Sequence, residues 1–276
     1  MEDTARLVLL VVVCLVFVGL FLFTTVYLLA DTIEKAWFSI FKKPLYVHFY
    51  PVKKDLAYQY EDILIQHFTF YNNLSHRHKK YFKHRVAKFI KRYKIHGREG
   101  LEVTPEIKVT IAATWVMLTF GMRKYLPHIF QDIILYPDVY QSVTGNWHKG
   151  EFNYPANVVI FSWKHFLQGV LGGAGNINLG LHEFAHVLHV YATDTDEAGA
   201  WGDLYAKMYN NVVDYLNHGQ NREALLEVGY LRDYAFTNNA EFMAVMLECF
   251  FETPDDFRVK MPELYNMAAT MINYRP

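Results

Sequence analysis

The sequence predicts a predominantly helical α+β fold with a small β-sheet, preceded by one N-terminal transmembrane helix. Three observations support this prediction: an uncharged apolar run near the N-terminus, helical hydrophobic periodicity over much of the remaining chain, and two short β-branched stretches near its middle. The 276 residues suffice for one domain with a buried core beside the apolar run. We therefore expect an anchor at residues 1–30, a juxtamembrane linker at 31–59 and a globular domain at 60–276.

The apolar run, Leu7–Ala30, is long enough to cross a bilayer, because a helix rises about 1.5 Å per residue. A cleaved signal peptide is the alternative, but the acidic start of the chain and the length of the run disfavour it. Basic residues mostly follow the run: Lys35, Lys42, Lys43, Lys53 and Lys54 come after it, whereas Arg6 precedes it. The positive-inside rule then predicts a single-pass membrane protein with its globular domain on the cytoplasmic side.

Composition narrows the range of partners and the compartment. The formal net charge is −1, so bulk electrostatics give no reason to expect a nucleic-acid partner. Of the two cysteines, Cys14 lies in the apolar run and Cys249 lies near the far end of the chain. They would have to pair across the membrane boundary, so no disulfide framework is predicted, which fits a reducing compartment.

Residues 75–94 predict a basic amphipathic helix. Aromatic and aliphatic residues recur at helical spacing, and the stretch from Arg77 to Lys94 holds nine Lys or Arg and no acidic residue. Ser75 suits the N-cap, and Gly97 and Gly100 suit the end of the segment. Two interpretations remain open: a surface helix whose apolar stripe packs on the domain, or a helix that lies on an anionic membrane surface.

The middle of the chain predicts one buried helix and two strands. Thr104-Pro105-Glu106 begins a helix that stays apolar to Leu118. Residues 132–136 and 157–163 are short β-branched stretches that predict strands, with Pro137 and Gly145-Asn146 supplying turns. The glycine-rich segment 169–180 lacks the Gly-Lys-Ser/Thr ending of a phosphate loop, so we interpret it as a flexible approach loop. From Leu181 onward the pattern is helical.

His182, Glu183 and His186 form an H-E-x-x-H motif in this last region. Positions i and i+4 of a helix share a face, so both imidazoles can bind one metal ion, as in catalytic zinc sites. The glutamate beside the first histidine can then accept a proton from a water molecule at the metal. The motif therefore predicts a zinc-dependent hydrolase.

A catalytic zinc site needs a third protein ligand. Glu241 is our candidate, because it begins an apolar helical pattern after the turn-like Thr237-Asn238-Asn239. Glu248 is seven residues further on the same helical face, so it can either support a ligating histidine or replace Glu241 as the ligand. His189 lies one turn past His186, and we expect it to pack or hydrogen-bond beside the site rather than bind the metal.

Peptide hydrolysis also needs a hydrogen-bond donor for the oxyanion that forms on the carbonyl. Tyr234 precedes Glu241 by seven residues and is a candidate donor. The chain contains 20 tyrosines, so the residues alone do not single it out.

Several stretches, in order and spacing, resemble the bacterial Mlc titration factor A family of gluzincin zinc peptidases, peptidase family M90. The fold of that family is related to the catalytic domain of anthrax lethal factor. The similarity extends from about residue 60 to residue 267. It is carried by Leu101-Glu102-Val103-Thr104, Ile134-Leu135-Tyr136-Pro137, Ser162-Trp163, the run from His182 to His186, Ala198-Gly199-Ala200-Trp201, Asp233-Tyr234-Ala235, residues 240–245, Glu248-Cys249-Phe250-Phe251 and Pro262-Glu263-Leu264-Tyr265.

The resemblance implies a zincin-like fold for residues 60–276 and a role for each site residue. His182, His186 and Glu241 are implied as Zn²⁺ ligands, Glu183 as the general base and Tyr234 as the oxyanion donor. A membrane-anchored zinc peptidase in the bacterial inner membrane, acting on peptide or protein substrates in an aminopeptidase-like manner, is therefore expected. The alternative is a regulatory protein that sequesters a transcriptional regulator or another partner and has low or latent peptidase activity.

Two further expectations follow from the resemblance. Zincins bind substrate backbone along a strand beside the cleft, and residues 157–163 are our candidate for that edge. His189 stands where relatives commonly have Asp, so the surroundings of the metal can differ in this chain. The anchor is a second departure, because typical members of the family are soluble.

Overall fold

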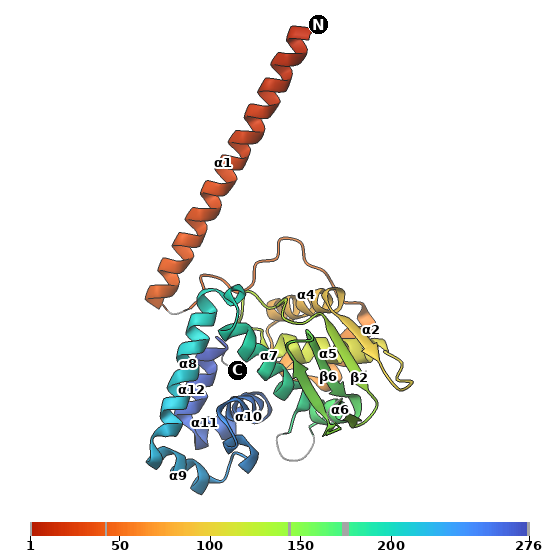
Figure 1. The fold of residues 1–276 in the computed structure, drawn as a ribbon, viewed down its shortest axis with the longest axis vertical. Helices are drawn as coiled ribbons and strands as arrows, with labels where there is room; N and C mark the ends of the chain where they lie inside the picture. Colours follow the sequence, from red (N-terminus) through yellow and green to blue (C-terminus); the bar gives the residue numbers. More distant parts are fainter. Residues whose placement is uncertain (1, 42, 143–144, 173–176, 275–276) are drawn as a thin grey trace. The chain divides into compact units, whose positions relative to one another are not determined.

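The computed structural model describes residues 2–41, 43–142, 145–172 and 177–274, and they divide into two compact units, Met1–Tyr46 and Val47–Pro276 (Figure 1). The first unit contains helix α1, Glu2–Phe41. Within α1, Asp3–Val26 is a stretch of 24 residues that is long and apolar enough to cross a membrane. At about 1.5 Å per residue this stretch exceeds the roughly 30 Å thickness of the hydrocarbon layer. The predicted apolar N-terminal helix is therefore present, and it continues beyond the apolar run.

The second unit begins with short helices that cover a buried one. The helices are α2 (Tyr58–His67), α3 (Thr69–Asn73), α4 (His76–Arg92) and α5 (Pro105–Leu118). The predicted N-cap of α4 is confirmed, since the Ser75 hydroxyl accepts from the N–H of His78. α5 begins where expected, and there the Thr104 hydroxyl accepts from the N–H of Ile107. α5 is buried along its length, and α4 packs its apolar stripe against it. The packed surface helix is thus confirmed for that stripe of α4.

A four-stranded mixed sheet follows, in the order β1-β2-β6-β5. β1 runs parallel to β2 and β2 parallel to β6, whereas β5 is antiparallel to β6. The bounds are β1 Lys94–Gly97, β2 Asp132–Tyr136, β5 Gly150–Asn153 and β6 Val158–Ser162; β3 (Tyr140–Gln141) and β4 (Trp147–His148) form a separate hairpin. Both predicted strands are confirmed.

The choice of an edge strand was wrong. β6 has a partner on each side, so its backbone N–H and C=O groups are used within the sheet. β5, which the sequence did not predict as a strand, forms the edge on this side of the sheet, and β1 forms the other edge.

The rest of the chain is helical, as predicted from Leu181 onward. After α6 (Trp163–Val170) come α7 (Leu179–Thr193), α8 (Ala200–Asn217), α9 (Gly219–Val228), α10 (Asn239–Glu252), α11 (Pro254–Lys260) and α12 (Pro262–Met271), with 3₁₀ turns η1 (Asp196–Ala198) and η2 (Asp233–Phe236). α7 runs between the sheet and the C-terminal helices (Figure 1). In the glycine-rich approach loop, residues 173–176 lie outside the described part of the chain.

A buried arginine on α4 ties together three parts of the second unit. The Arg85 side chain is fully buried and donates to the carbonyls of Thr119, Phe120, Met122 and Val47. It also donates to the Tyr50 hydroxyl at 2.7 Å and lies 4.2 Å from the ring centroid of Tyr125. Carbonyl dipoles and an aromatic face therefore solvate this cation within the core.

Replacing Arg85 by Met should destabilise the second unit by about 3 kcal/mol or more, because several buried carbonyls lose their donors. The measurement is thermal or chemical unfolding of the full chain in detergent, with Lys80→Met, an exposed position on α4, as the control. Equal stability of the two variants would show that water replaces the guanidinium without cost.

Candidate metal centre

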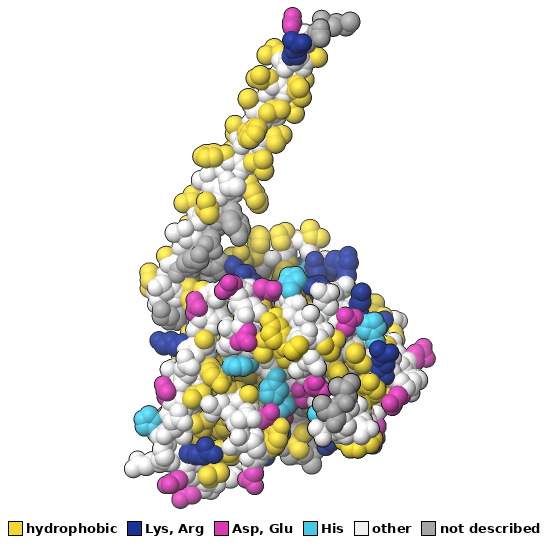
Figure 2. Space-filling view, in the orientation of Figure 1, with side chains coloured by type: hydrophobic (Ala, Val, Ile, Leu, Met, Phe, Trp, Pro, Cys, Tyr) yellow, Lys and Arg dark blue, Asp and Glu magenta, His cyan; other side chains and the backbone are white. Residues whose placement is uncertain are grey.

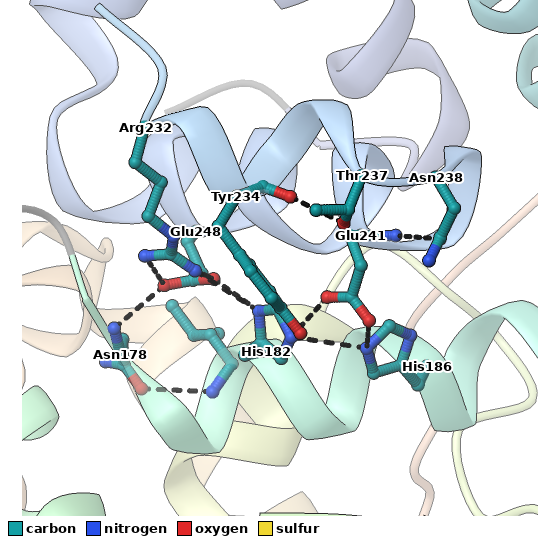
Figure 3. A network of polar contacts seen from close by, with 10 residues as sticks. Asn178, His182, His186, Arg232, Tyr234, Thr237, Asn238, Glu241 and Glu248 are labelled. Carbon is teal, nitrogen blue, oxygen red and sulfur yellow. Dashed lines mark hydrogen bonds and ion pairs between the residues drawn. The ribbon is translucent and has the colours of Figure 1, made fainter.

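α7 presents His182 and His186 on one face, one helical turn apart (Figure 3). Their Nε2 atoms are 3.3 Å apart, and the two rings are nearly perpendicular. His182 is buried and His186 is half-buried. The helix starts where the Asn178 side chain accepts from the N–H of Leu181, which fixes its first turn. The spacing of the motif is therefore realised as one pair of converging imidazoles.

Glu241 comes to the same point from the first turn of α10. The Asn238 side chain caps this helix by accepting from the N–H of Glu241, and α10 packs along α7. One carboxylate oxygen, Oε2, lies 2.9 Å from His182 Nε2, and the other, Oε1, lies 3.6 Å from His186 Nε2. The three side chains offer ligand atoms that all lie within 4.8 Å of one another.

The spacing of these atoms suits a small metal ion. Ligand atoms bound at 2.0–2.1 Å in tetrahedral directions lie about 3.3 Å apart. The two Nε2 atoms are 3.3 Å apart, and a different oxygen of the Glu241 carboxylate lies 2.9 Å from one of them and 3.6 Å from the other. Glu241 Oε2 is buried, and its contact with His182 lacks the geometry of a hydrogen bond. A buried carboxylate oxygen without a donor is what a cation would satisfy. The donor set of two imidazoles and one carboxylate therefore fits zinc.

Electrostatics add to this fit. Burial lowers the pKa of His182, but the carboxylates of Glu241 and Glu248 outweigh burial and raise the pKa to about 9. Burial likewise raises the pKa of Glu241, but the two imidazoles hold it well below its usual range. The cluster therefore favours positive charge between these side chains.

Glu248 lies on the other side of His182 and orients it. Its Oε1 is 2.7 Å from His182 Nδ1, so Nδ1–H donates there and Nε2 is left to face Glu241. Glu248 is fully buried and also receives hydrogen bonds from the Arg232 guanidinium and from the backbone N–H of Asn178. Of the two roles open to Glu248, the structure places it as the partner of a histidine, away from the cluster of ligand atoms.

Glu248→Gln should weaken metal binding by about 10- to 100-fold, because an amide polarises His182 less than a carboxylate does. Glu252→Gln is the matched control, since Glu252 accepts from the Asn178 side chain one turn further along α10. Competition with a chromophoric chelator measures both affinities. Equal metal affinities in the two variants would show that Glu248 does not contribute to metal binding.

Glu183 lies beside the ligand cluster and against the edge strand. It is only 9% exposed, and burial raises the pKa of its carboxyl above the usual range, although His182 and His186 oppose this shift. A Cβ atom at Gly150, the first residue of β5, would lie 2.7 Å from Glu183 Cγ and 2.9 Å from Oε1. Only glycine at position 150 leaves room for the glutamate where it stands. A carboxylate with a raised pKa next to a metal site is suited to proton transfer.

We expect Gly150→Ala to reduce peptide turnover by about 100-fold while metal content stays unchanged, because the added methyl group displaces Glu183 but touches no ligand candidate. Gly219→Ala serves as the control, since a Cβ at that position meets nothing within 4 Å. Parental turnover in Gly150→Ala would show that the position of Glu183 does not matter.

Tyr234 stands at the open side of the cluster. It belongs to η2, is about half exposed, and its ring centroid is 6.0 Å from that of His182. In Figure 3 its hydroxyl points toward Glu241 and His186. Burial and the nearby Glu241 carboxylate raise the pKa of the phenol, which therefore keeps its proton and can donate a hydrogen bond.

His189 packs away from the ligand cluster, against α8. Its ring lies 4.6 Å from that of Tyr209 and 5.9 Å from that of Tyr205, and its Nδ1 atom is buried without a hydrogen bond. Burial lowers the pKa of this imidazole. The expectation of a packed histidine beside the site is confirmed.

Sequence reasoning missed three contributors to this centre: Asn178, Arg232 and Gly150. Asn178 could have been recognised as the N-cap of the motif helix, and Arg232 stands two residues before Tyr234. Gly150 carried no local signal, because its role depends on a strand that pairs with β6 and passes Glu183.

Comparison with known proteins agrees with this geometry. The model of the family described as glucose-regulated metallo-peptidase M90 matches residues 51–272. Relatives named Mlc titration factor A, from Klebsiella pneumoniae strain 342 and Salmonella agona, are 25% and 24% identical over 201 residues, covering 65% of this chain and 73% of theirs. An uncharacterized protein, slr2042 of Synechocystis, is 23% identical over 252 residues, covering 83% of this chain and 84% of its own. The family implies a bound metal ion, and the chain belongs to the glucose-regulated metallo-peptidase M90 family.

Proposed function

We propose that this protein is a membrane-anchored zinc peptidase with a zincin-like catalytic domain. One observation carries the proposal: two imidazole Nε2 atoms and a glutamate carboxylate offer ligand atoms within 4.8 Å of one another, and a buried carboxyl of raised pKa lies beside them. A protein that only bound a metal ion would not need a carboxyl group at the position of Glu183. A hydrolase needs such a group for proton transfer.

His182, His186 and Glu241 would hold the zinc ion. When bound, zinc supplies Lewis acidity, which lowers the pKa of water and polarises a carbonyl group. Glu183 takes a proton from the water that attacks the peptide carbonyl and passes it to the leaving amine. The Tyr234 phenol donates a hydrogen bond to the oxyanion that develops on the carbonyl oxygen. Glu248, held by Arg232, keeps His182 in the required tautomer and orientation.

The edge strand β5 is our candidate for the substrate-binding strand. The first residue of β5, Gly150, adjoins Glu183. β5 pairs with β6 along one edge, and no strand of the described sheet pairs with its other edge. A substrate in extended conformation could pair with the outer edge, which would bring its backbone past the base. Whether cleavage begins at a free N-terminus or inside the chain then depends on what closes the end of this strand.

Anchoring is the second part of the proposal. α1 contains an apolar stretch of sufficient length for a bilayer, and the lysines that follow it favour a catalytic domain on the cytoplasmic side, at a bacterial inner membrane. Protease protection in intact vesicles tests the topology. Degradation of the second unit from the outside would contradict the cytoplasmic placement.

A regulatory role is the second candidate. The relatives bear the name Mlc titration factor A, which points to an interaction with a regulator named Mlc in those proteins. By analogy, this chain could sequester a protein partner and cleave peptides only slowly. The two candidate functions therefore predict different rates of peptide hydrolysis.

The test is hydrolysis of a peptide library by the full chain in lipid nanodiscs, with free and with acetylated N-termini, read by mass spectrometry. A zinc peptidase should release products that disappear on chelation, and the acetylated set separates exo- from endo-cleavage. A chain that retains one zinc ion but cleaves neither set would favour the regulatory role.

A further inference from the structure

One surface of the second unit combines outward apolar side chains with lysines. Residues 47–57 pass over α4, and Phe49 and Val52 are 69% and 84% exposed there. Lys53 and Lys54 follow directly, and Lys88 and Lys91 of α4 lie next to them. We refer to Phe49, Val52, Lys53, Lys54, Lys88 and Lys91 as the apolar–basic patch. Figure 2 shows hydrophobic side chains along the segment over α4, beside a group of Lys and Arg.

The segment is held firmly against α4, so the exposure of its apolar side chains does not arise from loose packing. Arg85 binds the Tyr50 hydroxyl and the Val47 carbonyl, and the N–H of Lys54 donates to His84 Nδ1 at 2.8 Å. The His48 ring stacks on Tyr81 at 4.8 Å. His48 and Tyr50 thus face inward, whereas Phe49 and Val52 point to solvent on a fixed backbone.

The lysines of the patch repel one another. Lys91 and Lys88 lower the pKa of the exposed Lys54, which shows that the three charges share one small area. Asp55, which follows Lys54 directly, pairs instead with Lys83 at 3.2 Å, and Glu61 pairs with the same lysine at 2.8 Å. Among the described residues, the patch therefore keeps an excess of positive charge that an anionic partner would relieve.

We propose that the apolar–basic patch docks on an anionic lipid bilayer, with Phe49 and Val52 entering the interfacial layer and the four lysines contacting lipid phosphates and acidic headgroups. Exposed aromatic and aliphatic side chains ringed by lysines are the composition of an interfacial membrane contact. A bilayer is favoured over other anionic partners by chain connectivity, since only residues 42–46 separate the membrane-length helix α1 from the second unit. The patch fixes which face of the second unit meets the membrane, beyond what a tether alone does.

The test places a fluorophore on the patch in the full chain. Val52→Cys, in a Cys14→Ser background, is labelled and reconstituted in nanodiscs that contain lipids with nitroxide-labelled acyl chains. Cys249 is buried and does not compete for the dye. Val259→Cys, at a 78% exposed position on α11, is the matched control site. Nanodiscs of neutral phosphatidylcholine are compared with discs that contain phosphatidylglycerol.

Docking predicts strong quenching of the Val52 label in anionic discs and weak quenching at Val259. Lys54→Glu with Lys91→Glu should lower the docked population by at least about tenfold, because each substitution replaces attraction to an anionic surface by repulsion. Quenching at Val52 that changes neither with lipid charge nor with these substitutions would overturn the proposal. So would a Val52 label that responds to added duplex DNA in neutral discs but not to anionic lipid, which would assign the patch to a soluble polyanion. Peptide turnover is measured in the same discs, so failed docking is distinguishable from a failed peptidase proposal.

Discussion

Replacing Glu183 by Gln is expected to reduce peptide turnover by about 10²- to 10⁴-fold while zinc content and fold are preserved. Glutamine has the same shape as glutamate and fits beside Gly150, but it cannot accept the proton of the attacking water. The substitution also removes a carboxyl that burial already disfavours in its charged form. Thermal stability should therefore not fall, which distinguishes a lost base from a damaged site.

Steady-state kinetics on one peptide substrate, together with metal analysis, measure this effect. Glu252→Gln is a useful reference, since it neutralises a carboxyl near the same helices that contacts the Asn178 side chain rather than a ligand candidate. Turnover in Glu183→Gln equal to that of the parent would contradict the assigned base, and loss of zinc would assign Glu183 to metal binding instead.

Substitution of a proposed metal ligand is expected to have the second large effect, which is a loss of zinc affinity. His186→Ala and Glu241→Ala are each expected to weaken zinc affinity by more than about 100-fold, a larger loss than removal of an outer partner causes. Either substitution leaves two donors where a catalytic zinc site uses three. Turnover should vanish together with the metal, unlike in Glu183→Gln.

His189→Ala is the matched control for His186→Ala, because both histidines lie on α7 and only one of them reaches the cluster. Zinc content after dialysis against a mild chelator is compared among five proteins: the parent, these three variants and Glu248→Ala. Zinc kept by Glu241→Ala but lost by Glu248→Ala would move the third ligand to Glu248.

The part of the metal centre that lies on a single helix could be predicted from the sequence. His182 and His186 follow from a spacing of four residues, since the helix places both imidazoles on one face. Glu241 required an inference across the chain, and the capped start of α10 supports it. Tyr234 was selected only through resemblance, because nothing local distinguishes it from the other tyrosines.

The remaining parts depend on contacts that the sequence does not display. β5 has no apolar alternation, and it becomes a strand by pairing with β6. That pairing also makes β6 internal, which is why residues 157–163 were wrongly expected at the edge. The position of Arg85 likewise could not be predicted from the sequence. It lies in a basic helical pattern that is typical of solvated charges, but it is buried and donates hydrogen bonds to carbonyls that follow α5.

The most direct test of the account is the return of activity during a zinc titration. The full chain is stripped with a chelator, zinc is added back stepwise, and bound metal and peptide turnover are measured on the same samples. We expect turnover to rise in proportion to bound zinc and to level off at about one ion per chain, the capacity of a single three-ligand site. Turnover that survives stripping, or zinc that binds at this stoichiometry without restoring any turnover, would contradict a metal-dependent peptidase.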